Sequence, residues 1–316
     1  MELKKQRVIP KKRRVKKLGF KQTMRRYGLV YLMFLIPLAV LLMFKYIPMY
    51  GAQIAFRNYK PALGVLKSQW AGFKYFIKFF ESPYFVTTIK NTLTLNMYSL
   101  LTFPLCLVFA LMLRYCRSHR FGKSVQMVSY APHFISTVIV CSMVTLFLSP
   151  SAGIINHIIA ALGGERFAFM QSPEAFKWIY VISGVWQGLG WSSIIFFATL
   201  SGVDKALLEA AEIDGANRFQ RIWHINVPVL MPTVIILLIL QVGSLLGVGY
   251  EKAFLLQNST NLSASEIIST YVYKVGLEQA DFSFGTAAGL FNSVVNTILL
   301  LATNWISKKV TDTGLF

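Results

Sequence analysis

Charged residues are scarce in this chain, and its apolar stretches contain almost none. Only 14% of the 316 residues are charged, 55% are hydrophobic, and mean hydropathy is +0.53. A soluble domain averages about 45–50% apolar residues. Because the apolar residues gather in blocks of about twenty, each block can cross a bilayer as a helix. None of the blocks alternates as a β-barrel strand does. The sequence therefore predicts an all-α, polytopic membrane protein.

Cysteine and histidine are also rare. The three cysteines, Cys106, Cys116 and Cys141, lie in or beside apolar blocks and have neither metal-ligand spacing nor the pattern of a disulfide scaffold. The four histidines are scattered along the chain. We therefore expect no catalytic residue, no metal and no cofactor bound by this chain.

The positive charge is concentrated near the beginning of the chain. The net charge is +19, but 12 of the 32 Lys and Arg residues lie within the first 26 positions. A basic tail directly before a span follows the positive-inside rule, so we expect no nucleic-acid partner. The apolar run that follows is too long for a signal peptide and lacks a small-x-small cleavage site. It is expected to be a retained first span.

Six spans are expected, at residues 27–48, 92–113, 125–148, 178–200, 228–250 and 285–306. The connections on the side of the two termini hold roughly twice as many basic residues as the opposite ones, which include Lys252. Both termini are therefore expected in the cytoplasm. The expected organisation is a basic cytoplasmic tail at 1–26, a six-helix transmembrane domain at 27–306, an outer interfacial segment at 49–91, a cytoplasmic loop at 201–227 and a short cytoplasmic tail at 307–316.

The outer segment is rich in aromatic residues at helical spacing. They are Trp70, Phe73, Phe76, Phe79 and Phe80, with Lys74 and Lys78 between them. This pattern predicts a helix that lies in the outer membrane interface.

The expected spans supply no means of powering transport. Spans two to six contain no Asp, Glu, Lys or Arg, whereas an ion-coupled carrier is expected to place a carboxylate at mid-depth. Gly122-Lys123-Ser124 resembles the end of a phosphate-binding loop, but Arg117 stands where its first glycine is required. Energy for uphill transport is therefore expected to come from a partner.

The most informative segment is the loop between spans four and five. Asp204 can cap a helix of good helix formers, and Gly215 can end it in the left-handed conformation. A second short turn at 218–224 leads to Pro228 at the start of span five. The sequence therefore predicts a helix–turn–helix across the inner face of the membrane.

The spacing in this loop resembles a known family motif. Glu209-Ala210-Ala211, then Gly215, then Ile225-Asn226-Val227-Pro228 is similar to the E-A-A-x3-G-x9-I-x-L-P loop of binding-protein-dependent ABC importer permeases. Val227 departs from the usual leucine. The basic tail, the aromatic outer loop and Tyr271-Val272-Tyr273 before the last span are similar to the carbohydrate-uptake class of these permeases. Together with the ending Lys308-Lys309 through Gly314-Leu315-Phe316, they are most similar to permeases for oligo- or polysaccharides that work with lipoprotein binding proteins.

The resemblance implies a fold and a set of partners. It implies the type I ABC importer permease fold in the bacterial cytoplasmic membrane, paired with a second homologous permease. Two cytoplasmic ATPase subunits would use ATP and Mg, and an extracytoplasmic solute-binding lipoprotein would deliver the carbohydrate. The ATPase-coupling element would be formed by Glu209, Ala210, Ala211, Asp214 and Gly215.

A neutral sugar needs hydrogen-bonding groups and aromatic faces. Side chains of both kinds in the spans are the candidate substrate-pathway residues: His133, Trp186, Gln187, Trp191, Gln241, Tyr250 and Asn292. Helix packing is the alternative role for each of them. With no charged group expected at depth, a neutral solute is favoured over a charged one. The alternative is a polyanionic glycan that the partner subunit or the binding protein recognises.

Other functions remain open at this point. The family includes permeases for solutes other than sugars. An ion-coupled secondary carrier would transport alone on an ion gradient, and a membrane enzyme or signalling scaffold would need clustered His, Asp or Glu at an interface.

Overall fold

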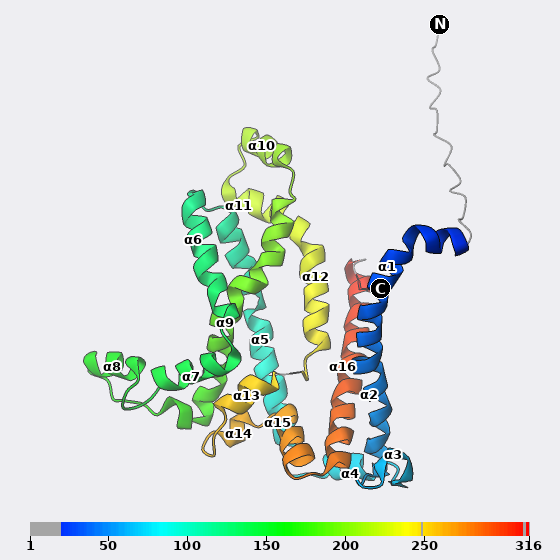
Figure 1. Ribbon diagram of the computed structural model, residues 1–316. Helices are drawn as coiled ribbons and strands as arrows, with labels where there is room; N and C mark the ends of the chain where they lie inside the picture. The colour runs from blue at the N-terminus through cyan, green and yellow to red at the C-terminus, as the bar shows by residue number, and fades with distance from the viewer. Residues whose placement is uncertain (1–19, 248, 312–313, 316) are drawn as a thin grey trace. The chain divides into compact units, whose positions relative to one another are not determined.

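The structure is a computed structural model that describes residues 20–247, 249–311 and 314–315. Helices dominate the described residues, which confirms the all-α prediction (Figure 1). The chain divides into two units, Met1–Ala52 and Gln53–Phe316, and each is described by itself. Residues 1–19 of the predicted basic tail lie outside the described residues, as do positions 312, 313 and 316 of the short tail.

The described part of the first unit is one long helical run. It passes from α1 (Phe20–Leu41) through the π-helical turn η1 (Leu42–Tyr46) and α2 (Ile47–Met49) into the 3-10 segment η2 (Tyr50–Phe56). Pro48 lacks an N–H, and its ring clashes with the carbonyl four residues earlier, so the helix widens into a π turn just before it. The stretch Gln22–Phe56 is long and apolar enough to cross a membrane.

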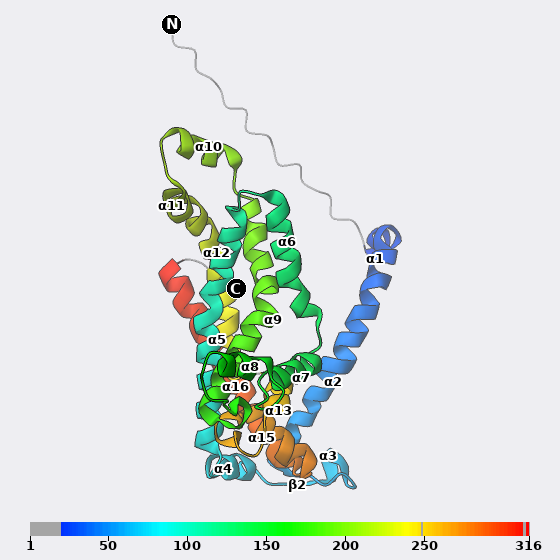
Figure 2. The same cartoon turned by 90° about the vertical axis from the view of Figure 1, so that its left-hand side faces the viewer.

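The second unit is built around four long helices, α5 (Phe85–Arg114), α9 (Pro173–Ser201), α12 (Val227–Gly243) and α16 (Phe282–Thr311). Helix α5 packs along α9, α12 packs along α16, and α9 also contacts α12. Figure 2 shows α5, α6 and α9 running side by side. Five helices of the described chain are long and apolar enough to span, and a bent pair supplies a sixth.

The bent pair corrects the prediction for span three. The expected continuous span at 125–148 is wrong, because the helical stretch of α6 (His119–Tyr130) and the 3-10 turn η3 (Ala131–Phe134) meets α7 (Thr137–Phe147) at 101°. The bend follows η3, where Ile135 and Ser136 are extended. The Ser136 hydroxyl then caps the new helix by accepting from the amide of Ile139.

Span five is displaced from its expected position. The helical run starts at Arg218, in α11 (Arg218–Arg221) and the π turn η5 (Ile222–Asn226), and α12 ends at Gly243, not at residue 250. The π turn again ends two residues before a proline, Pro228. Ser244, Gly247 and Gly249 follow α12, and serine and glycine favour turns over helix.

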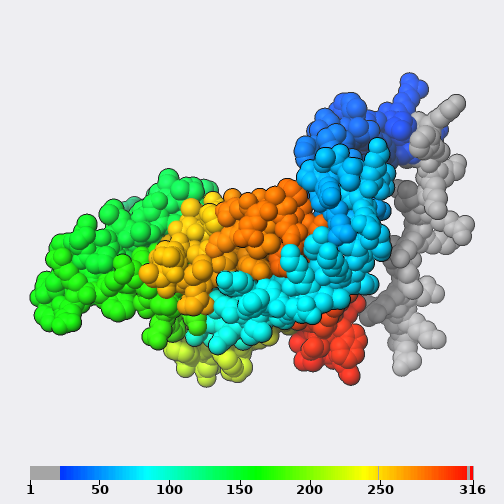
Figure 3. All heavy atoms as spheres, turned by 90° about the horizontal axis from the view of Figure 1, so that it is seen from below, coloured from blue at the N-terminus to red at the C-terminus, as the bar shows by residue number. Residues whose placement is uncertain are grey.

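Short elements fill the end of the second unit that the sequence predicts to be outer. They are β1 (Arg57–Asn58), α3 (Gly64–Lys67), β2 (Gln69–Trp70), α4 (Lys74–Phe80), α8 (Ile154–Ala161), η4 (Phe169–Gln171), α13 (Tyr250–Leu256), α14 (Leu262–Ser265), α15 (Ile268–Tyr273) and the π turn η6 (Lys274–Glu278). Figure 3 shows the orange segment of α15 beside the cyan start of α5, and the two helices are in contact.

The aromatic helix of the outer segment is shorter than predicted. Helix α4 holds Phe76, Phe79 and Phe80, but Trp70 lies in β2, where it pairs with Arg57 in an antiparallel ladder. Gly72, at φ 57°, separates the strand from the helix. The α4 ring of Phe79 is fully buried against Phe284 of α16, at 5.9 Å between ring centroids.

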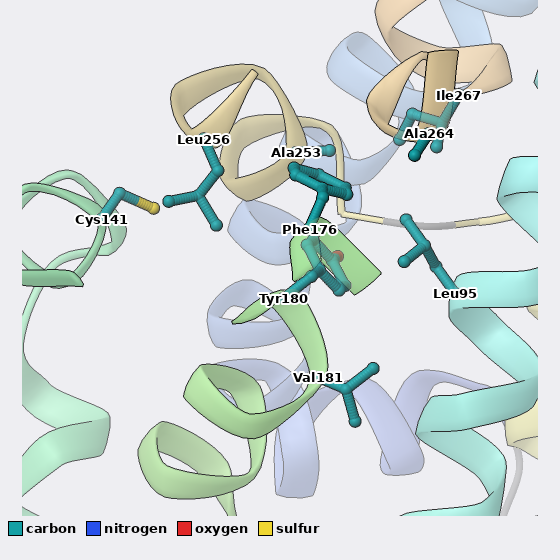
Figure 4. Packing of buried hydrophobic residues seen from close by; sticks show 9 residues of the cluster. All are labelled: Leu95, Cys141, Phe176, Tyr180, Val181, Ala253, Leu256, Ala264 and Ile267. Atoms are coloured by element: carbon teal, nitrogen blue, oxygen red, sulfur yellow. The ribbon is translucent and has the colours of Figure 1, made fainter. Parts of the chain in front are cut away.

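A hydrophobic cluster joins the long helices to α13–α15. Figure 4 shows Phe176, Tyr180 and Val181 of α9 directed toward residues of α5, α7 and α13–α15. These partners are Leu95, Cys141, Ala253, Leu256, Ala264 and Ile267. The cluster fixes α13 against α9, and this contact determines where the side chains of α13 lie.

Candidate functional site

The loop between α9 and α12 folds into the predicted helix–turn–helix. Helix α10 (Lys205–Ile213) begins after Asp204, whose Oδ1 accepts from the amide of Ala206 at 2.9 Å. This cap satisfies one of the amides that the first helical turn leaves free. Figure 1 shows α10 and α11 at one end of the second unit, with α13–α15 at the other.

Gly215 ends α10 as the sequence predicted. Its φ is +81°, a conformation that costs side-chain-bearing residues energy. The amide of Ala216 donates to the carbonyl of Ala211 at 2.8 Å, and the amide of Gly215 donates to that of Glu212 at 3.1 Å. These two bonds form a Schellman motif, which closes the helix and turns the chain back.

Polar side chains connect the loop to itself and to the neighbouring loop. The Arg221 guanidinium donates to a Glu212 carboxylate oxygen at 2.8 Å, which joins α11 to α10. At the start of α12, the buried Asn226 amide donates to the Tyr115 hydroxyl at 2.7 Å. This second bond fixes the end of the loop to the connection after α5.

The loop at residues 204–228, called the coupling loop below for the role that its sequence predicts, presents an apolar surface that the rest of the second unit does not cover. Ile213 is 87% exposed and Phe219 is 84% exposed. Beside them is a groove of about 370 Å³ lined by Ala211, Asp214, Gly215, Ala216, Gln220, Arg221, His224 and Ile225. Small side chains and a glycine turn allow another helix end or groove to approach closely.

A cavity of about 690 Å³ lies between α5, α9, α12 and α13. Its lining includes three of the candidate pathway residues, Gln187, Trp191 and Gln241, together with the hydroxyls of Ser99, Thr102 and Ser192. The fold thus brings side chains from α9 and α12 to one cavity. Mixed hydroxyl, amide and aromatic groups are suited to a sugar.

His133 and Trp191 form one aromatic platform. Their rings are stacked, with 4.3 Å between centroids and 5° between planes. The bend at η3 is what brings His133 over α9. The nearby Gln187 amide donates to the carbonyl of Ile135 at 3.1 Å, so this side chain also supports the bend.

The other three candidates lie elsewhere. Trp186 lines a wholly different hollow with apolar side chains of α7, α8 and α9. The Tyr250 ring is stacked on Phe254, at 5.4 Å between centroids, and tilted against Tyr273, at 5.0 Å. The Asn292 carbonyl oxygen accepts from the Asn296 amide at 3.4 Å, a contact within α16.

The cavity also contains a charged residue that the sequence analysis assigned to an outer loop. Lys252 of α13 is only 9% exposed and lines the cavity wall. Its Nζ donates to the carbonyl of Tyr180 at 2.7 Å and lies 4.7 Å from the centroid of the Tyr180 ring. Burial lowers the pKa of Lys252 to about 8. The glycines at 247 and 249 were the available signal, because they end α12 early and let α13 fold back.

No three His, Cys, Asp or Glu side chains among residues 20–247, 249–311 and 314–315 gather as a metal site.

Comparison with known proteins identifies the class. Residues 89–312 match the family described as binding-protein-dependent transport system inner membrane component. The chain belongs to this family. It is therefore the multi-pass membrane permease of an ABC importer, located in the cytoplasmic membrane, and ATP hydrolysis resides in partner subunits.

Individual relatives are similar over nearly their full length. The chain is 41% identical to "Protein LplB" of Bacillus subtilis (strain 168), over 98% of this chain and 99% of the relative. It is 42% identical to the polygalacturonan/rhamnogalacturonan transport system permease protein YteP of the same organism, over 98% of this chain and 96% of the relative.

Solved structures share the fold. One chain of a bacterial ABC transporter involved in the import of the acidic polysaccharide alginate superposes with a TM-score of 0.84 at 40% identity, covering 92% of this chain and 99% of that chain. A second, from the alginate transporter in complex with alginate pentasaccharide-bound periplasmic protein, gives 0.85 at 39% identity, covering 94% and 99%. The ABC importer permease fold expected from the sequence is thereby confirmed.

Proposed function

We propose that this permease moves an oligosaccharide derived from a polysaccharide, as one half of a translocation pathway driven by ATP hydrolysis in partner subunits. The observation that best supports the proposal is the coupling loop. It combines a capped helix, a glycine turn and exposed apolar side chains at one end of a membrane domain. Relatives named for polygalacturonan, rhamnogalacturonan and alginate transport support a carbohydrate as the solute.

The proposed assembly has one role for each end of the second unit. The coupling loop faces the cytoplasm, with the N- and C-terminal tails at 1–26 and 307–316, and each permease of a homologous pair seats its loop on one of two ATPase subunits. Glu209, Ala210, Ala211, Asp214 and Gly215 form that contact. An extracytoplasmic binding lipoprotein docks at the opposite end, over the outer segment 49–91, and releases the sugar into the pathway.

The cavity between α5, α9, α12 and α13 is the proposed route of the sugar. Gln187 and Gln241 offer amides, and the Trp191–His133 stack offers a flat face for the CH surface of a pyranose ring. Trp186, Tyr250 and Asn292 lie outside this cavity, and we assign them to helix packing instead.

Two linked experiments test the proposal. Purification of the tagged chain should recover a second permease and a nucleotide-binding subunit, identified by mass spectrometry. Proteoliposomes that contain this complex and its binding protein should accumulate oligosaccharide only with Mg-ATP. Transport by the purified chain alone, driven by an ion gradient, would instead establish a secondary carrier.

A further inference from the structure

The buried lysine of the cavity wall differs from two other lysines at the same end of the second unit, which form ion pairs. Lys78 pairs with Asp281 at 2.7 Å, and Lys274 pairs with Glu266 at 2.7 Å. Lys252 is more deeply buried than either, yet no described carboxylate lies within ion-pair distance of it. A buried charge is costly unless it is paired, so Lys252 lacks the anion that its position calls for.

The Lys252 ammonium has unused hydrogen-bond donors. Of its three N–H donors, one is directed to the Tyr180 carbonyl at 2.7 Å. The Tyr180 ring, 4.7 Å from Nζ, supplies a cation–π contact that holds the ammonium without using its remaining donors. Two donors therefore remain for a ligand.

The backbone of α9 leaves room for the ammonium itself at the cavity wall. Gly184 faces Lys252, and a Cβ at this position would lie 3.1 Å from Nζ. Gly184 and Lys252 line the same cavity as Gln187, Trp191 and Gln241. The ammonium is thus positioned beside the proposed sugar route, in a wall that is otherwise apolar or neutral.

We propose that Lys252 is a specificity-determining residue of the pathway, where its ammonium binds the carboxylate of a uronic acid unit in a passing acidic oligosaccharide. This inference rests on the proposed function, because it assumes that the cavity carries a glycan. It reverses the expectation of a neutral solute, which depended on the absence of charge from the pathway. A single cation binds each carboxylate only weakly. The oligosaccharide can therefore enter the pathway and still leave it, which several cations around one carboxylate would prevent.

Two variants distinguish the charge of Lys252 from its structural role in α13. Lys252→Gln keeps an N–H donor for the Tyr180 carbonyl and removes the charge, whereas Lys252→Arg keeps the charge. Each is reconstituted as the whole transporter with its binding protein and Mg-ATP. The probes are trigalacturonate and its fully methyl-esterified form, which has the same sugars without carboxylates.

Lys252→Gln should lower trigalacturonate uptake about tenfold, as expected for loss of a charged hydrogen bond, and leave uptake of the ester within about twofold. Lys252→Arg should retain most of the trigalacturonate uptake. Equal losses for both probes would show that Lys252 only supports α13, and unchanged uptake of both would show that its charge is irrelevant; either result overturns the inference.

A wild-type complex that moves neither probe nor any other oligosaccharide would contradict the proposed function itself, and the inference with it.

The pH dependence provides a second measurement. Since the Lys252 pKa is lowered to about 8, the ammonium is mostly charged at pH 7 and mostly neutral at pH 9. Tyr180 of α9, Cys141 of α7 and Glu251 of α13 are the titratable groups around it. Trigalacturonate uptake relative to ester uptake should fall several-fold over this range in the wild type and stay level in Lys252→Arg, whose guanidinium remains charged. A level ratio in the wild type would overturn the inference.

Discussion

The coupling loop and the cavity wall use their residues in opposite ways. In the loop, the proposed function depends on local backbone geometry: Asp204 starts α10, Gly215 ends it, and α10 buries none of its side chains. In the wall, the proposed function depends on side chains from helices far apart in sequence, such as Gln187 and Lys252, brought together by packing. The loop can therefore be altered by a substitution that changes one backbone conformation, whereas the cavity wall is altered by substitutions that add or remove side-chain volume.

The largest effect is expected from a substitution at the glycine turn of the coupling loop. Gly215→Val should abolish uptake while leaving membrane insertion intact and ATP hydrolysis uncoupled, because a β-branched residue at φ +81° is strained and redirects α10. Uptake and ATPase rates in proteoliposomes measure this. Gly215→Asn is the matched control, since asparagine tolerates the left-handed region, and it should retain much of the uptake. Normal uptake by Gly215→Val would contradict the coupling role.

The next effect is expected where α9, which carries much of the wall, packs against α6. At Gly190, a Cβ would lie 2.2 Å from the Ser129 carbonyl oxygen, whereas at Gly188 it would meet nothing within 4 Å. Gly190→Ala should cost about 1–3 kcal/mol through forced separation of α6 and α9. Thermal unfolding of the detergent-purified complex should show a lower midpoint for Gly190→Ala and an unchanged one for Gly188→Ala. Equal midpoints would mean that α6 moves freely against α9.

A third change removes one wall surface without filling space. Trp191→Leu should reduce oligosaccharide uptake several-fold, because it removes the ring that lines the cavity and stacks on His133. Trp186→Leu, on the same helix but in a separate apolar hollow, should leave initial uptake rates near those of the wild type. A reversed order of the two variants would exclude this cavity as the sugar route.

The smallest effect is expected at the ion pair within the loop. Glu212→Gln removes the Arg221 pair, but the Glu212 side chain is 67% exposed, and such pairs contribute about 0–1 kcal/mol. Uptake should fall by about twofold at most, measured as an initial rate at physiological salt. A complete loss would show that the pair, in addition to the caps, organises the loop.

The sequence predicted the loop far better than the wall, for physical reasons. Helix caps and glycine turns act over a few residues, so the limits of α10 follow from Asp204 and Gly215 alone. The bend between Phe134 and Thr137 and the early end of α12 were missed, because hydropathy does not register a break inside an apolar block. The position of Lys252 depends on the contacts of α13 with other helices, α7 and α9 among them, and no local pattern contains that information.

The most direct test of the central claim is a cross-link from the coupling loop. A photoreactive amino acid is placed at Ile213, which is 87% exposed in the coupling loop, or at Leu162, which is 83% exposed at the end of α8. In membranes that contain the whole transporter, Ile213 should form an adduct with the ATPase subunit, identified by mass spectrometry, and Leu162 should form none. Absence of the Ile213 adduct, or equal adducts from both positions, would contradict the account that ATP hydrolysis acts on this permease through the loop.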